Sequence, residues 1–258
     1  MVSLRLETVG VKLGRRIVVR DASAAFAPGT LTGVVGPNGA GKSTLARAML
    51  ALVPHSGRIL LDEADIASLS RAALARRVAY LPQGQTLHWP LDVERLVGLG
   101  RLPHLGPMSR IGAEDAAAIE RAMERADVLG LRDRIATELS GGERARVLLA
   151  RALAVQAPAL IADEPLASLD PGHQLDVMEL LRDEARAGAL VIAVLHDLTM
   201  AARYCDRLVL VDTGTIVADG TPAEVLTPAN LRTVYGIDAR VELGGDWPAI
   251  TTLGRSRA

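Results

Sequence analysis

The segment GPNGAGKST, residues 36–44, directly follows the apolar run Leu31–Val35 and combines three glycines, one lysine and two hydroxyl side chains. Glycines let the backbone turn tightly, so that successive N–H groups can face one anion. Lys42 adds a compact positive charge, and the hydroxyl of Ser43 can bind Mg²⁺. A helix over 42–52 would direct the positive end of its dipole at the same point. The pattern predicts a cradle for nucleotide phosphates built from Gly36, Pro37, Asn38, Gly39, Ala40, Gly41, Lys42, Ser43 and Thr44.

A second candidate site is the pair of carboxylates that ends the apolar stretch ALIADEP, residues 159–165. In an open α/β sheet, ligands bind beyond the carboxyl ends of the strands. One carboxylate at that place suits the second shell of Mg²⁺, and its neighbour can orient or activate a water aimed at a terminal phosphate. Such a pair taken alone is as often a solvated strand end. The phosphate loop upstream favours a catalytic role for Asp163 and Glu164.

A third candidate is LSGGE, residues 139–143, which opens a helix expected over 143–155. Ser140 is a good helix cap, and the two glycines leave the first amides of the helix uncovered, as an anion site requires. The phosphate loop already provides for the nucleotide of this chain. A spare phosphate site at Ser140, Gly141 and Gly142 therefore suggests that it serves the nucleotide of another subunit.

The elements that must position these sites can be placed from hydrophobic periodicity. Residues 1–35 alternate apolar and polar side chains, which predicts short strands with turns. The stretch 84–140 carries apolar residues at helical spacing with no strand between them. From 143 onward, continuous apolar strands alternate with helices, which indicates a parallel sheet covered on both faces. The fold class is therefore α/β, and the pattern over 236–258 predicts no definite element.

Composition narrows the classes of function. The chain has 258 residues, a formal net charge of -1 and one cysteine, so no internal disulfide can form. Its apolar runs are far shorter than the ~20 residues that cross a bilayer, and no signal-peptide pattern opens the chain. Aromatic residues make up 2%, which argues against a base-stacking surface for single-stranded nucleic acid. We expect a cytoplasmic protein that reaches a membrane only through a partner.

The motifs together resemble the nucleotide-binding subunit of an ATP-binding cassette (ABC) transporter. The phosphate loop, Gln83 in YLPQ, the signature LSGGE, the strand ending ADEP, the D-loop 167–170 and His196 in VLHD come in the order of that family. The resemblance covers about residues 3–235. It implies a P-loop NTPase core with an N-terminal antiparallel β subdomain and a helical subdomain. The ATPase domain would then span 1–235, with core and β subdomain over about 1–83 and 157–235, the helical subdomain over about 84–156, and a C-terminal extension over 236–258.

The resemblance also assigns roles. Two copies would meet head to tail as a homodimer, each ATP lying between one phosphate loop and Ser140, Gly141 and Gly142 of the other copy. Glu164 would be the catalytic carboxylate. Asp163, Ser43 and Gln83 would lie at the Mg²⁺ ion. Gln83 would also sense the attacking water, and His196 would contact the γ-phosphate. ATP and Mg²⁺ are the expected cofactors.

One position departs from the family pattern. An aromatic side chain near the N-terminus usually stacks on adenine, and Leu13 occupies the corresponding place in VKLGRRIVV. An aliphatic side chain gives less stacking, so adenine is expected to be held loosely, or by Arg15 or Arg16. Selectivity for ATP over GTP is therefore less strongly specified than phosphate binding.

The segment after Gln83 is where importers of this family meet the membrane permease. Residues 92–104, DVERLVGLGRLPH, resemble the corresponding stretch of subunits that import iron–siderophores, haem and cobalamin. The resemblance implies a peripheral subunit on the cytoplasmic face of the cell membrane, working with permease subunits and, indirectly, with a substrate-binding protein. His88, Trp89 and His104 also permit a metal or haem site, but partner contact or ordinary packing fits their position better.

Two alternatives remain at this point. One is a soluble ABC-type ATPase that acts on ribosomes or DNA, and the other is an importer subunit for a different cargo. Relatives that act on ribosomes or DNA commonly carry two cassettes, long coiled insertions or basic extensions. A single cassette, a short insert and a near-neutral charge favour the importer, with no nucleic-acid partner expected. A P-loop kinase or GTPase would leave LSGGE and His196 unexplained.

Overall fold

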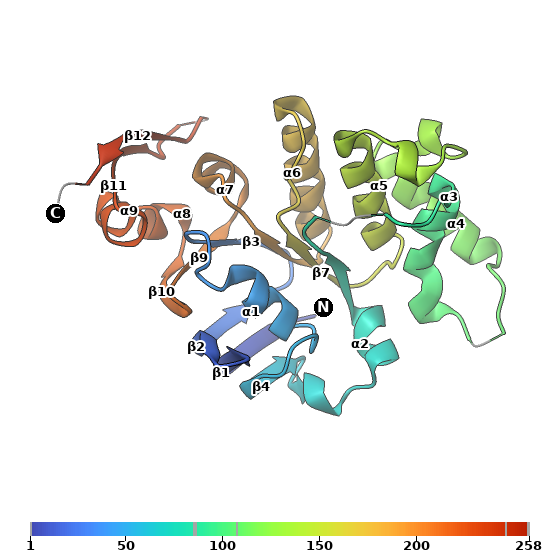
Figure 1. Cartoon of the computed structure of the whole chain (residues 1–258), viewed down its shortest axis with the longest axis horizontal. Helices are drawn as coiled ribbons and strands as arrows, with labels where there is room; N and C mark the ends of the chain where they lie inside the picture. Colours follow the sequence, from blue (N-terminus) through green and yellow to red (C-terminus); the bar gives the residue numbers. More distant parts are fainter. Residues whose placement is uncertain (1, 85–86, 107, 246, 257–258) are drawn as a thin grey trace.

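The computed structural model describes residues 2–84, 87–106, 108–245 and 247–256, and a six-stranded sheet lies at its centre (Figure 1). The strand order is β10-β9-β3-β8-β7-β6, with all neighbours parallel except the hairpin of β9 and β10. Strands β3, β7 and β8 are almost wholly buried, and most of their residues are apolar, as a sheet covered on both faces requires. The bounds are β3 Thr30–Val35, β6 Val78–Leu81, β7 Ala159–Asp163, β8 Leu190–Val194, β9 Arg207–Asp212 and β10 Thr215–Gly220.

A second, four-stranded antiparallel sheet has the order β2-β1-β4-β5. Helix α1 lies between the two sheets and packs on β1 and β2 on one side and on β7 and β8 on the other. The predicted N-terminal strands are thus confirmed, but β3, the last of them, belongs to the central sheet. The bounds are β1 Leu4–Leu13, β2 Arg16–Phe26, β4 Ser56–Leu61, β5 Ala64–Asp65 and α1 Lys42–Ala48.

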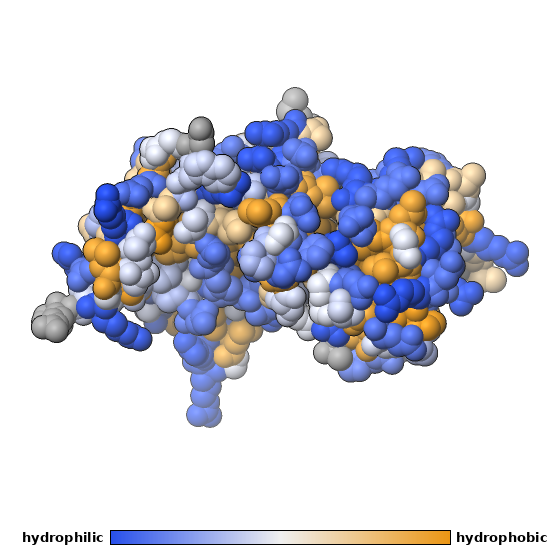
Figure 2. All heavy atoms as spheres, turned by 90° about the horizontal axis from the view of Figure 1, so that it is seen from above, coloured by the Kyte–Doolittle hydropathy of each residue, from blue (hydrophilic) through white to orange (hydrophobic). Residues whose placement is uncertain are grey.

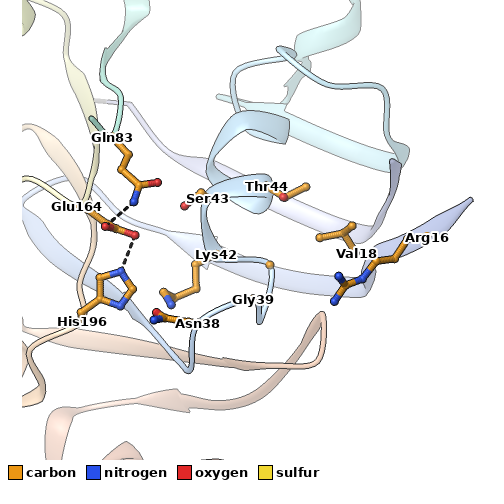
Figure 3. A pocket seen from close by; sticks show the side chains of 11 residues that line it. Arg16, Val18, Asn38, Gly39, Lys42, Ser43, Thr44, Gln83, Glu164 and His196 are labelled. Atoms are coloured by element: carbon orange, nitrogen blue, oxygen red, sulfur yellow. Dashed lines mark hydrogen bonds and ion pairs between the residues drawn. The ribbon is translucent and has the colours of Figure 1, made fainter. Parts of the chain in front are cut away.

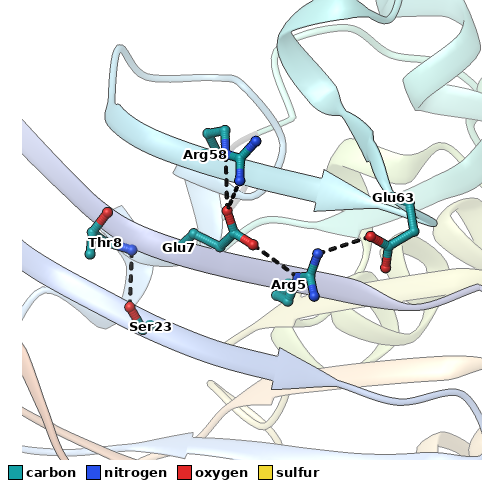
Figure 4. Close-up of polar contacts among 6 residues, drawn as sticks. All are labelled: Arg5, Glu7, Thr8, Ser23, Arg58 and Glu63. Atoms are coloured by element: carbon teal, nitrogen blue, oxygen red, sulfur yellow. Dashed lines mark hydrogen bonds and ion pairs between the residues drawn. The ribbon is translucent and has the colours of Figure 1, made fainter.

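The outer face of this second sheet is charged (Figure 4). The Glu7 carboxylate lies between two guanidinium groups, 3.2 Å from Arg5 Nε and 2.6 Å from Arg58 Nη2. Arg5 Nη2 is also 2.9 Å from Glu63 Oε2. Exposed pairs of this kind contribute little to stability. They mark the solvent side, while the alternate apolar residues of β1 are buried toward α1.

The opposite face of the central sheet is covered by α6 and α7. Alternate residues of each buried strand therefore enter two separate cores, Val194 toward α1 and Ala193 toward the other side. Both cores consist largely of aliphatic side chains. The helices are α6 Pro171–Arg186, with Asp170 as its cap, and α7 Leu198–Tyr204.

The segment predicted as helical forms a group of helices at one end of the molecule (Figure 1). Within its described residues the only β pairing is an isolated bridge between Asp92 and Ile135. Helix α5 packs on α3 and α4 and also on β6, which joins this group to the sheet. The bounds are α2 Arg71–Arg77, which precedes β6, α3 Val93–Gly98, the 3-10 helix η2 Leu99–His104, α4 Ala113–Arg125 and α5 Gly141–Leu153.

The chain ends in elements that the sequence pattern did not predict. Helices α8 Pro222–Val225 and α9 Pro228–Tyr235 are followed by the hairpin of β11 Ile237–Glu242 and β12 Ala249–Arg255. The hairpin packs on α9 and α7, and the Arg203 guanidinium lies 4.5 Å from the centre of the Trp247 ring. Among the described residues, every helix is too short or too polar to pass through a bilayer.

Candidate functional site

Four neighbouring strands of the central sheet end at one cavity of about 440 Å³ (Figure 3). The phosphate loop follows β3, Gln83 follows β6, Glu164 follows β7 and His196 follows β8. Since β3, β8, β7 and β6 are adjacent and parallel, their carboxyl ends meet at one edge, where open sheets bind ligands. The lining residues are Arg16, Val18, Asn38, Gly39, Gly41, Lys42, Ser43, Thr44, Gln83, Glu164 and His196.

The phosphate loop has a conformation that two of its glycines enforce. Gly36 has φ 150°, and a Cβ there would lie 2.0 Å from the Val211 carbonyl oxygen. Gly41 has φ 103°, and its Cβ would lie 2.8 Å from the Val18 carbonyl oxygen. Residues other than glycine rarely adopt such φ values. The two backbone contacts also leave no room for a Cβ atom at either position. The loop is therefore pressed against β2 and β9.

Lys42 is buried and directs its ammonium group into this loop. Its Nζ donates to the Gly36 carbonyl oxygen at 2.7 Å and to the Pro37 carbonyl oxygen at 3.0 Å. Burial lowers the pKa of Lys42, and the nearby carboxylates of Glu164 and Asp163 act in the opposite direction. Both acceptors are uncharged carbonyls. An anionic phosphate oxygen would be a stronger acceptor for the same group.

Ser43 and Asp163 form a polar pair at the base of the cavity. Ser43 Oγ donates to Asp163 Oδ1 at 2.8 Å, and the Tyr80 hydroxyl donates to Asp163 Oδ2 at 3.3 Å. Asp163 is 1% exposed, and this burial raises the pKa of its carboxyl. Tyr80 was not among the predicted site residues, because nothing in a four-residue strand indicates a partner 83 positions away.

The donor set around this pair fits Mg²⁺. The amide oxygen of Gln83 is turned toward Ser43 (Figure 3). A hydroxyl, a buried carboxylate and an amide oxygen are the hard oxygen ligands that this ion prefers. In the part of the chain that is described, no cluster of three or more His, Cys, Asp or Glu side chains could hold a metal.

Glu164 is held from two sides. Gln83 Nε2 donates to Glu164 Oε2 at 2.7 Å, and His196 Nε2 lies 2.5 Å from Glu164 Oε1 (Figure 3). Glu164 has φ 54°, in the left-handed region, and its side chain is 16% exposed. Strained residues of this kind concentrate at functional sites. Both carboxylate oxygens thus have a fixed direction at the mouth of the phosphate loop.

The far end of the cavity is lined by Arg16 and Val18, not by Leu13. Leu13 is 44% exposed and pairs with Arg16 across the turn between β1 and β2. Of the residues named as candidates for the adenine site, Arg16 is therefore the one that borders this cavity. A guanidinium plane can stack on a base as an aromatic ring does.

The signature residues lie outside this cavity. Ser140 caps α5, accepting from Glu143 N at 3.3 Å, while Glu143 accepts from Ser140 N at 2.8 Å. Helix α5 begins at Gly141, two residues before the predicted start. Ser140, Gly141 and Gly142 are not among the lining residues of the phosphate cavity. Gly141 borders a separate hollow of about 150 Å³ beside Ser168 and Glu164.

Comparison with known proteins adds the family context. The family model described as ABC transporter matches residues 19–167. The chain is 46% identical over 247 residues to the cobalamin import ATP-binding protein BtuD of Halobacterium salinarum, covering 95% of the chain but 61% of that relative. It is 43% identical over 245 residues to the hemin import ATP-binding protein HmuV of Pseudomonas aeruginosa, covering 93% of the chain and 94% of the relative. A dimeric structure of a bacterial ABC transporter cassette superposes with a TM-score of 0.75 at 25% identity, over 85% of the chain and 98% of the cassette.

Proposed function

The chain belongs to the ABC transporter family as one of its ATP-binding subunits, and we propose that it hydrolyses ATP to drive import through a membrane permease. The observation that carries the proposal is the single cavity that gathers the phosphate loop, Gln83, Glu164 and His196. A phosphate cradle alone would serve binding only. A carboxylate oriented from two sides at its mouth adds the means to activate water.

In the proposed mechanism the phosphates of ATP take the place of the loop carbonyls as acceptors for Lys42. Mg²⁺, when bound near Ser43, Asp163 and Gln83, would neutralise charge on the phosphate oxygens. The buried Asp163 holds the Ser43 hydroxyl in place through their 2.8 Å hydrogen bond. Arg16 and Val18 would face the base at the far end of the cavity.

For hydrolysis, Glu164 accepts a proton from water as the water oxygen attacks the γ-phosphorus. The bond from the γ-phosphorus to its bridging oxygen breaks, and ADP keeps that oxygen. In the free chain Gln83 and His196 fix the direction of the two Glu164 oxygens. With ATP bound, the His196 N–H would turn from Glu164 to the γ-phosphate as charge develops there. The three side chains lie on three different strand ends, so the sheet sets their spacing.

The active form is proposed to be a homodimer. Within one chain, Ser140, Gly141 and Gly142 do not border the phosphate cavity. The amides of Ser140 and Glu143 are engaged in the cap of α5, so the amides of Gly141 and Gly142 are the ones proposed to face a phosphate of a second copy. The dimeric cassette that superposes on this chain is in keeping with that arrangement.

The permease is proposed to bind the helical end of the molecule. Figure 2 shows apolar side chains among polar ones at the end that carries α3, α4 and α5. We define the insert surface by Trp89, Leu99, Leu102, Met108 and Ile111, which are between 39% and 95% exposed. Exposed apolar groups of this size suit a protein partner.

The cargo is proposed to be an iron chelate, haem or cobalamin. Support comes from the cobalamin and hemin import relatives and from LGRLPH in η2. We also propose 1–235 as the ATPase domain, with core and β subdomain over about 1–83 and 157–235 and the helical subdomain over about 84–156. Residues 236–258 would be an extension, since α9 ends at Tyr235 and a separate hairpin follows.

The test is transport by the chain co-purified with a candidate permease and reconstituted in vesicles. Ferric chelates, haem and cobalamin are offered separately with ATP, and Glu164→Gln serves as the inactive control. We expect one cargo class to accumulate with ATP and not with the control. ATP hydrolysis that no permease stimulates, together with accumulation of none of the three, would contradict the importer assignment.

A further inference from the structure

The motif LGRLPH in η2 makes contacts that the proposed catalytic cycle does not use. Arg101 is only 4% exposed, although it lies in a short helix at the surface of the helical group. Its Nη1 donates to the Ala154 carbonyl oxygen at 2.8 Å and to Gln156 Oε1 at 3.2 Å. Its Nε donates to Asp115 Oδ1 at 2.9 Å. The buried guanidinium therefore links Asp115 of α4 to the residues that follow α5, through its Nε and Nη1.

Two further residues of the motif contact the same place. His104 Nε2 lies 2.8 Å from the Val155 carbonyl oxygen, so this nitrogen carries the hydrogen. Gly100 packs so closely that a Cβ would lie 2.2 Å from the Arg151 carbonyl oxygen. Glycine, arginine and histidine thus bring η2 against one point, the last turn of α5 and the residues just after it.

That point is the opposite end of the signature helix. The final carbonyls of a helix lack partners within it and carry the negative end of its dipole, which a guanidinium satisfies well. Helix α5 has 13 residues, so it is about 20 Å long at 1.5 Å per residue. Its first residues are Gly141 and Gly142, with Ser140 as cap. An anchor at one end therefore fixes the direction in which the other end points.

The anchor also connects α5 to α4 and to the insert surface. Asp115 accepts from Arg101 and from the Gly112 amide, 3.1 Å away, at the start of α4. Leu99 and Leu102, on the solvent side of the same η2, belong to the insert surface. If a bound partner displaced η2, the end of α5 would therefore move with it, because the two are joined by close contacts.

We propose that Arg101 and His104 are positioning residues that anchor the end of α5 to η2 and thereby aim Ser140, Gly141 and Gly142 at the nucleotide of a second copy of this chain. The inference rests on the proposed homodimer, and it adds a mechanical route from the insert surface to the signature residues. The anchor does not touch the nucleotide of its own chain, because no residue of η2 lines the phosphate cavity.

The experiment measures two properties of the full chain in a Glu164→Gln background. One is ATP affinity at a protein concentration where the chain is monomeric, and the other is the ATP-dependent dimer dissociation constant by analytical ultracentrifugation. The test variants are Arg101→Met and Arg101→Lys. The matched control is Met123→Ala, a fully buried residue of α4 that takes part in none of the hydrogen bonds of the anchor. Melting temperature is recorded for each.

We expect Arg101→Met to weaken the dimer on the order of tenfold, with monomer ATP affinity unchanged. Arg101→Lys keeps the charge without the planar fork and should recover only part of the loss. Met123→Ala should lower the melting temperature at least as much while leaving the dimer constant near the parent value. An equal loss of dimer in Arg101→Met and Met123→Ala would overturn the positioning role.

A milder pair tests the same anchor if Arg101→Met does not fold. His104→Gln retains an N–H donor for the Val155 carbonyl, and His104→Leu removes it. We expect the leucine variant to weaken dimerisation severalfold and the glutamine variant to restore it. Equal dimer constants for the two would overturn the inference. Failure of the Glu164→Gln parent to dimerise with ATP would instead count against the homodimer of the proposed function, which keeps the two results distinguishable.

Discussion

Replacing Glu164 by glutamine tests the proposed catalytic carboxylate with almost no change of shape. The carboxylate offers one oxygen to Gln83 at 2.7 Å and the other to His196 at 2.5 Å. An amide has a single acceptor oxygen. Either Gln83 or His196 therefore loses its acceptor, unless that donor side chain turns to another partner. Loss of one hydrogen bond costs about 1 kcal/mol, and in a chain of this size that lowers the melting temperature by roughly 2–4 °C.

The effect on turnover should be far larger than the effect on stability. A positioned general base contributes about 10²–10⁴-fold to rate, which corresponds to roughly 3–5 kcal/mol of the activation barrier. Glutamine cannot accept the proton of the attacking water, and it keeps neither carboxylate charge nor basicity. Nucleotide affinity should remain, because Lys42 and the loop amides provide it and both are untouched.

Steady-state phosphate release and ATP binding by calorimetry, on the same preparations, separate these effects. We expect turnover to fall at least a hundredfold, with the dissociation constant for ATP within a few-fold of the parent. A variant that hydrolyses ATP at a rate close to the parent would refute the role of Glu164. Loss of ATP binding together with loss of turnover would instead indicate that the substitution disturbs the loop.

Two further predictions concern buried groups. Lys42→Ala should weaken ATP binding about tenfold or more in calorimetry, because a charge-assisted contact is lost, whereas the exposed Lys12→Ala should bind as the parent does. Equal affinities of the two variants would contradict the proposed role of Lys42. The Cys205 thiol should resist a disulfide reagent in the folded chain and react after unfolding, since burial strongly raises its pKa. Rapid labelling of the native chain would show that this region opens.

The sequence predicted the central sheet and its loops because the information is local. Strands β7 and β8 are continuous apolar runs; β7 ends at Asp163, and β8 ends at Val194, two residues before His196. The phosphate loop needs glycine at 36 and 41 for reasons of backbone geometry alone. Parallel pairing then brings Glu164 and His196 together without any further signal. The roles of these residues stay predictions, while the fold and the family are confirmed.

Other features depend on contacts between distant segments. Tyr80 reaches Asp163 only because β6 and β7 are neighbours, and Arg16 rather than Leu13 borders the cavity because of the turn between β1 and β2. An arginine such as Arg101 is normally expected at the solvated surface, yet the packing of η2 against α5 buries it. Apolar and polar residues alternate only weakly along the hairpin at 237–255, because most of β12 is exposed. The sequence therefore contains no clear strand pattern there.

The bonds of Lys42 to its own loop bear on how quickly a nucleotide can arrive. Gly36 and Gly41 are held in their conformations by neighbouring backbone, and the ammonium is already directed into the loop. Binding of phosphate then exchanges acceptors without refolding, so little conformational entropy is lost. Association at such a rigid site should be limited by encounter, and differences in affinity should come from the rate of departure. We expect association of ATP to be fast. In the proposed homodimer, docking of the second copy, rather than nucleotide binding, would then be the rate-limiting step of each cycle.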